Sequence, residues 1–149
     1  MNAQFQPSLG YLAQTETLKG IGVFASRAIE AGEVVEVSPV IQLKLEFEEM
    51  EVDLKRRVFN WERLASLQGI SAIALGYGSM YNHANPANMR YSSDFAGEAI
   101  AFIAVRAINR GEELTINYNA TGGEPVSGED IWFKVCDVVP LRSDIPKDT

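Results

Sequence analysis

The chain has 149 residues, 46% of them hydrophobic and 22% charged, and a net charge of −7. These values indicate one globular domain spanning residues 1–149, with a core from about residue 8 to 135 and a tail at 136–149 that we expect to be flexible. One cysteine and one histidine exclude an internal disulfide and a Cys/His zinc cluster.

The negative charge bears on partners. No cluster of Lys and Arg contains interleaved aromatic residues, which argues against direct nucleic-acid binding. An acidic surface would suit a lysine-rich substrate, although it also serves solubility alone. No apolar run reaches the length of a membrane span, and "MNAQFQPSLG" lacks the features of a signal peptide. We therefore expect no membrane contact and an intracellular, by default cytoplasmic, protein.

The first pattern along the chain is a glycine pair in "LKGIGVFA" (Leu18–Ala25). Glycine lets a backbone approach a ligand closely, but a tight turn explains the pair equally well. The pattern A-x-R-A-I-x-x-G-E follows at Ala25 and returns at Ala104. Each copy combines a β-prone run with a glycine, at Gly32 and Gly111, and predicts a hairpin-like unit.

Between these copies lie two further strand signals and one helical signal. "VIQLKL" (Val40–Leu45) alternates like a strand, and "EAIAFIAV" (Glu98–Val105) is apolar like a buried strand. In residues 46–67, Met50, Leu54 and Val58 recur at helical spacing and predict one or two short helices. The fold class is therefore mainly β with a small helical insert.

The single histidine lies in "SMYNHANPAN" (Ser79–Asn88), a segment poor for both helix and strand. Asn and Pro favour a turn there. Near the carboxy terminus, "GEELTINYN" ends a β-prone run with a tyrosine, Tyr118.

Taken in order, "KGIGVFA", "GYGSMYNHANPAN" and "GEELTINYN" resemble the SET-domain protein lysine methyltransferases, and most of all the minimal viral and bacterial type. The resemblance runs from about residue 19 to 133. It implies a β-clip fold of short sheets with a carboxy-terminal pseudoknot. It also implies S-adenosylmethionine (SAM) as cofactor, a protein lysine as acceptor and no metal. Some small members of the family pair to complete a peptide groove, so a homodimer is consistent with it.

The resemblance also assigns site residues. Tyr118 takes the place of the tyrosine on which catalysis depends. Asn82 would contact the methionine part of SAM, and backbone groups of His83 would hold the adenine, so that the imidazole packs and positions and is not a general base. Tyr77, Tyr81 and Trp132 could each line the substrate channel or belong to the core. The backbone predicted to lie along SAM comprises Lys19, Gly20, Ile21, Gly22, Val23 and Phe24.

The implied reaction is a direct displacement of methyl from a sulfonium by a neutral amine, which needs alignment and desolvation. A tyrosine hydroxyl and backbone carbonyls can hold the methyl by weak C–H···O contacts. An apolar channel and the positive sulfonium would lower the pKa of the lysine amine.

Several residues depart from the family pattern. Ala84 replaces a Ser, Pro86 comes one residue early, and Asn117 stands where Asp is frequent. Ile116, assigned to the substrate channel, replaces a Phe or Tyr that often limits methylation, which predicts transfer of more than one methyl group. The Gly-rich residues 119–130 are either a lid over the peptide groove or a spacer.

These departures leave alternatives open. One is a catalytically silent SET-like module that binds SAM or peptide. A second is another β-clip binding domain, and a third is a methyltransferase that acts on a small amine.

Overall fold

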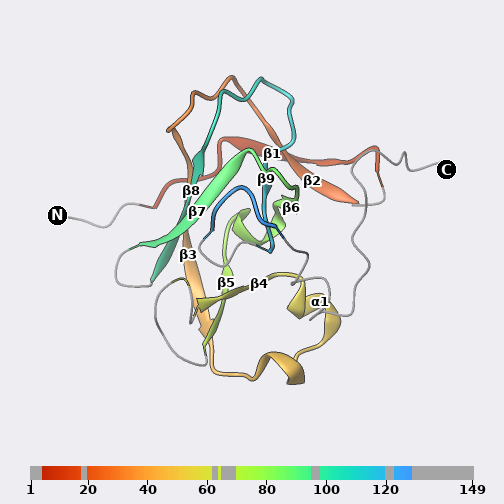
Figure 1. The fold of residues 1–149 in the computed structure, drawn as a ribbon, viewed down its shortest axis with the longest axis vertical. Helices are drawn as coiled ribbons and strands as arrows, with labels where there is room; N and C mark the ends of the chain where they lie inside the picture. The colour runs from red at the N-terminus through yellow and green to blue at the C-terminus, as the bar shows by residue number, and fades with distance from the viewer. Residues whose placement is uncertain are drawn as a thin grey trace.

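The computed structural model describes residues 5–17, 20–61, 64, 70–94, 98–119 and 123–128. These residues form three short sheets that curl around one core, with few helices (Figure 1). The prediction of a mainly β chain is therefore confirmed. The predicted extent of the core reaches beyond the described residues and stays a prediction.

The largest sheet has five antiparallel strands in the order β4-β5-β3-β8-β7. This sheet contains both strands predicted from the sequence. β3 includes most of the predicted strand 40–45, and β8 includes almost all of the apolar run 98–105. Its inner face carries the core aromatics, with the rings of Phe59 and Tyr91 5.3 Å apart and those of Tyr81 and Phe102 4.8 Å apart. The strands are β3 (Val34–Leu43), β4 (Val58–Asn60), β5 (Ser71–Ala74), β7 (Met89–Asp94) and β8 (Ala99–Ala104).

Two smaller sheets complete the fold. In one, β1 (Gly10–Gln14) pairs antiparallel with β2 (Ile21–Ala25). In the other, β6 (Asn82–His83) pairs in parallel with β9 (Thr115–Ile116), strands that are distant in sequence. This parallel pair lies at the centre of the molecule in Figure 1. It is the crossing expected of the carboxy-terminal pseudoknot.

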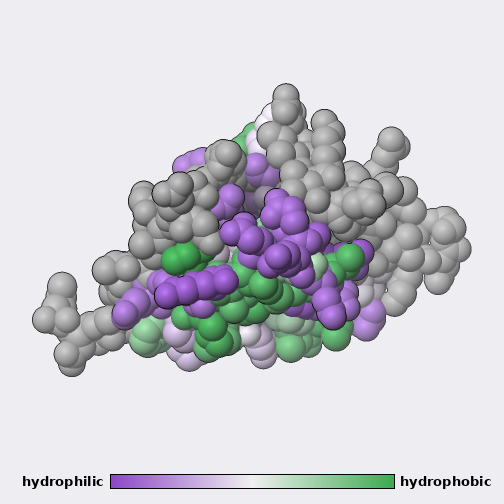
Figure 2. Space-filling view, turned by 90° about the horizontal axis from the view of Figure 1, so that it is seen from below, coloured by the Kyte–Doolittle hydropathy of each residue, from purple (hydrophilic) through white to green (hydrophobic). Residues whose placement is uncertain are grey.

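The predicted helical insert is helical in part of its described residues. It contains η1 (Phe47–Glu49) and α1 (Val52–Lys55), so the prediction of short helices is confirmed there. Val58 does not continue them; it opens β4 and pairs with β5, because this Val-Phe-Asn run finds a sheet edge. Figure 2 views the molecule from the end that carries η1 and α1, where hydrophobic and hydrophilic surface lie side by side. No helix in the described part of the chain has the length and apolarity that a membrane crossing requires.

The two A-x-R-A-I-x-x-G-E copies are related by an internal pseudo-twofold. Ile29 and Ile108 exchange both backbone hydrogen bonds at 2.9 Å. Gly32 N–H donates to the Ala104 carbonyl and Gly111 N–H donates to the Ala25 carbonyl, each at 2.8 Å. Both glycines have φ of +85°, which side chains strongly disfavour.

The copies are not hairpins, and that prediction was wrong. β2, which enters the first copy, pairs with β1, whereas β3, which leaves it, pairs with β5 and β8. Each turn thus bonds to the other turn and not to its own flanking strands.

Candidate active site

The parallel β6–β9 pair brings the histidine segment to the carboxy-terminal tyrosine. Asn82 lies opposite Thr115 and His83 opposite Ile116, and Ala84 N–H donates to the Ile116 carbonyl at 3.0 Å. The chain therefore reaches Tyr118 directly after passing beside His83.

His83 holds the backbone of Tyr118. The Tyr118 N–H donates to His83 Nδ1 at 3.0 Å, and the two rings lie 5.4 Å apart. A nitrogen that accepts this bond has no lone pair left for a proton from substrate. The predicted positioning role of the imidazole thus has a structural basis, while the contact of His83 with adenine stays a prediction.

The Tyr118 hydroxyl points at a backbone carbonyl. It donates to the Tyr81 oxygen at 2.6 Å. Burial raises the pKa of Tyr118 well above its usual value, so the hydroxyl keeps its proton at neutral pH. A phenol oxygen and a carbonyl oxygen therefore lie side by side at a half-buried position.

The glycine strand β2 lies against the other side of Asn82. Asn82 Nδ2 donates to the Ile21 carbonyl at 3.1 Å and to Glu113 Oε2 at 2.7 Å. A Cβ added to Gly22 would lie 2.7 Å from Glu113 Oε2 and 3.1 Å from Asn82 Nδ2, so a larger residue here would push these two side chains aside. The tight turn into this strand is also present, since Gly20 has φ of +79° and its carbonyl accepts from the Thr15 N–H at 2.7 Å.

The segment before Tyr118 joins these parts. Leu114 N–H donates to the Val23 carbonyl at 2.7 Å, and Phe24 forms a bridge with Glu113. The three motifs read from the sequence therefore meet at one place. Of the predicted residues, Gly20, Ile21, Gly22, Val23, Phe24, Asn82, His83 and Tyr118 gather there, whereas Lys19 and Trp132 lie outside the described residues.

Three of the predicted channel residues pack in or against the hydrophobic core. Tyr81 is 1% exposed, so its ring fills the core. Tyr77 is half-buried against that core, and Ile116 is buried within it. The core alternative fits the Tyr81 ring better, and the channel role of all three stays a prediction.

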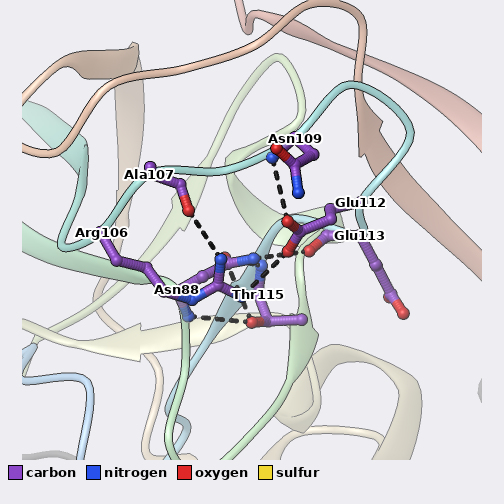
Figure 3. A network of polar contacts seen from close by, with 7 residues as sticks. All are labelled: Asn88, Arg106, Ala107, Asn109, Glu112, Glu113 and Thr115. Carbon is purple, nitrogen blue, oxygen red and sulfur yellow. Dashed lines mark hydrogen bonds and ion pairs between the residues drawn. The ribbon is translucent and has the colours of Figure 1, made fainter.

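Sequence reasoning gave no role to Glu113, Asn88 and Thr115, which build the network in Figure 3. Asn88 Nδ2 donates to the Glu113 carbonyl at 2.8 Å, and the Thr115 N–H donates to Asn88 Oδ1 at 2.9 Å. Asn88 is 4% exposed, so its amide is a buried tie between the two motifs. The sequence feature that could have pointed to Asn88 is its position at the end of "NPAN", where the family pattern also ends in Asn.

Two of the departures from the family pattern, Asn117 and the Gly-rich segment, contact each other. Residues 123–128 lie along the segment that follows His83, with Ala87 N–H donating to the Pro125 carbonyl at 2.8 Å and Tyr91 N–H to the Gly123 carbonyl at 3.0 Å. Asn117 Nδ2 donates to Ser127 Oγ at 3.0 Å, a bond that an Asp could not donate. This part of the predicted lid or spacer is therefore docked.

Short curled sheets, a parallel crossing and a half-buried tyrosine whose hydroxyl binds a backbone carbonyl are the features of the SET class of β-rich domains. A model of the SET domain matches residues 20–119. A Schizosaccharomyces pombe protein named histone-lysine N-methyltransferase, H3 lysine-37 specific, is 34% identical over 116 residues, which cover 78% of this chain and 71% of that protein. The chain belongs to the SET domain family.

Solved structures agree on the fold. A candidate histone methyltransferase of Plasmodium falciparum superposes with a TM-score of 0.60 at 22% identity, over 76% of this chain and 96% of that one. The Chaetomium thermophilum polycomb repressive complex 2 gives 0.62 at 24% identity, over 77% of this chain and only 16% of that one. The same fungal complex bound to S-adenosylmethionine, in an autoinhibited conformation, gives 0.60 at 22% identity over 80% of this chain and 16% of that one.

Proposed function

We propose that this chain transfers methyl groups from SAM to the side-chain amine of a protein lysine. The observation that supports this function best is the 2.6 Å contact between the Tyr118 hydroxyl and the Tyr81 carbonyl. Two oxygens that converge at the edge of the core suit a transferring methyl, because its polarised C–H groups are weak hydrogen-bond donors.

The residues present fit SAM. Gly20, which directly precedes β2, is partly exposed, and a Cβ added to it would meet nothing within 4 Å, so its backbone is open to a ligand. Asn82 has both of its amide hydrogens directed to Ile21 and Glu113, which leaves Oδ1 to accept from an ammonium such as that of a methionine moiety. SAM, when bound here, supplies an electrophilic methyl on a sulfonium.

The chain then contributes alignment more than acid or base chemistry. His83 holds the Tyr118 backbone, and Tyr118 with the Tyr81 carbonyl orients the methyl. The acceptor amine must be neutral to take the methyl group, so it would release its proton to solvent beforehand. Since Tyr118 stays protonated, we assign it no role as a base.

The acceptor is a lysine-containing protein, and the net charge of −7 favours a basic segment of it. Because Ile116 is a buried aliphatic residue without a hydroxyl, we also propose that more than one methyl is added to the same lysine. Mass spectrometry that shows only monomethyl-lysine at full turnover would contradict this. A homodimer and a cytoplasmic location remain predictions, which light scattering and fractionation can check.

The first test is methyl transfer from isotopically labelled SAM to lysine-rich peptides and to a cell extract. Tyr118→Phe should lower kcat by about 100-fold or more, because one oxygen that orients the methyl is lost. Tyr11→Phe, at an exposed tyrosine, is the matched control and should leave the rate unchanged.

Two other outcomes decide against the proposal. SAM binding without any transfer supports the silent binding module. Failure to bind SAM contradicts the cofactor assignment altogether.

A further inference from the structure

Glu36 in β3 is a buried carboxylate that the site described above does not use. It is 2% exposed. Its Oε1 accepts from the Tyr81 hydroxyl at 2.7 Å, and its Oε2 accepts from the Tyr77 N–H at 3.0 Å. Burial raises the pKa of this carboxyl group. Since burying a carboxylate costs free energy, a residue of this kind needs compensating contacts.

Both contacts fall on one short turn. Tyr77 and Tyr81 immediately flank η2 (Gly78–Met80), so Glu36 binds the turn at its two ends. The approach is close, because a Cβ added to Gly76 would lie 2.5 Å from Glu36 Oε2. The Tyr81 hydroxyl has a second partner in Ser8 Oγ at 2.8 Å, which fixes the ring further.

The same turn delivers the carbonyl of the site. Tyr81 binds Glu36 through its side chain and accepts from the Tyr118 hydroxyl through its backbone oxygen. A shift of this residue would therefore move one of the two oxygens that converge at the methyl. The cofactor side of the site, formed by Gly22, Asn82 and Glu113, is held by separate contacts.

We infer that Glu36 is a positioning residue for methyl transfer, which holds both ends of η2 so that the Tyr81 carbonyl faces the Tyr118 hydroxyl. This inference rests on the proposed function. It separates two properties of the enzyme: loss of the Glu36 contacts lowers the rate of transfer and leaves SAM binding intact.

The test compares three variants with the parent chain. Glu36→Gln keeps the size of the side chain and can still accept from Tyr81, but its NH2 group then faces the Tyr77 N–H. Tyr81→Phe removes the hydroxyl and keeps the carbonyl. Glu33→Gln is the matched control, since Glu33 pairs with Arg27 on the surface and not with η2.

Glu36→Gln and Tyr81→Phe should each lower kcat by about 10- to 100-fold, because misplaced groups lose alignment. The dissociation constant of SAM by calorimetry should stay within about twofold of that of the parent in every variant, because that wall of the site is separate.

The outcomes are distinguishable. Unchanged kcat in Tyr81→Phe and Glu36→Gln, with any fall confined to the melting temperature, would show that Glu36 only stabilises the fold. If Glu36→Gln does not fold, Tyr81→Phe alone decides in the same way. If the parent binds SAM without transferring methyl, the proposed function fails and this inference fails with it.

Discussion

Two adjacent glutamates, Glu112 and Glu113, have different partners and therefore different roles. Glu112 turns outward to pair with Arg106 at 2.9 Å, whereas Glu113 turns inward to Asn82 at 2.7 Å (Figure 3 shows the first). Both belong to the motif "GEELTINYN", and their sequence context alone does not distinguish them. The difference follows from the fold, because Glu112 closes the turn beside Asn109 while the backbone of Glu113 bridges to Phe24 next to Asn82.

Glu113→Gln should weaken SAM binding by about 10-fold, since a charged hydrogen bond that orients the Asn82 amide is lost. Calorimetric titration with SAM measures this directly. Glu112→Gln is the control and should bind SAM like the parent. Equal affinities in the two variants would mean that Glu113 does not orient Asn82.

At the scale of elements, the docked segment 123–128 depends on one glycine. Gly123 has φ of +77°, and a Cβ there would lie 1.8 Å from the Tyr91 carbonyl oxygen. Gly128, in the same segment, has nothing within 4 Å of such a Cβ. The two glycines therefore form a matched pair.

Gly123→Ala should destabilise the docked segment by about 1–3 kcal/mol, because alanine there is strained and collides with backbone. The amides of Ala87 and Tyr91, which donate to this segment, should exchange with deuterium faster than in the parent. Gly128→Ala should leave both rates unchanged. Protection that survives in Gly123→Ala would show that these amides do not depend on the segment.

The elements also show how far sequence reasoning reaches. Alternation and apolar runs predicted β3 and β8, and the glycines at φ of +85° marked both turns. The pattern could not predict that each turn pairs with the other copy, because pairing partners are set by tertiary contacts. β4 was missed for the same reason, since it spans three residues and gains its stability from a neighbouring strand. The crossing formed by β6 and β9 was expected from the family resemblance alone, because no local pattern marks two strands of two residues each.

The site followed a similar division. Tyr118, Asn82 and the glycine strand were found because they belong to ordered motifs. Glu36 and Asn88 were given no role, because a buried carboxylate or amide has no local sequence pattern and only the fold reveals its partners. Lys19 and Trp132 stay predictions.

On the scale of the whole molecule, the pseudo-twofold repeats one ion pair on each side. Arg27 pairs with Glu33, and Arg106 pairs with Glu112. The guanidinium partners lower the pKa of both carboxyl groups below the usual 4.5. A lowered pKa means that the stabilisation is present above the unfolded-state value and is lost as the pH falls through the folded-state value.

Glu112→Gln should therefore lower the free energy of unfolding by about 0.5 kcal/mol at neutral pH, as expected for an exposed pair. The difference from the parent should vanish in acid, well below pH 4.5. Urea unfolding across this range measures it. Glu36 contributes with the opposite sign, because burial raises its pKa and its ionisation on going to neutral pH costs stability. A Glu112→Gln difference that persists in acid would show that the pair is not its origin.

The parallel β6–β9 pair has a consequence for the order in which the molecule is assembled. Antiparallel neighbours such as β7 and β8 lie close in the chain and can meet early, whereas His83 reaches Ile116 only after the intervening polypeptide has been synthesised and arranged. A nascent chain can therefore bury most of its sheet while it still lacks the crossing that seats Tyr118. We therefore expect the competence to transfer methyl to appear late in folding and to be lost early when the β6–β9 crossing opens.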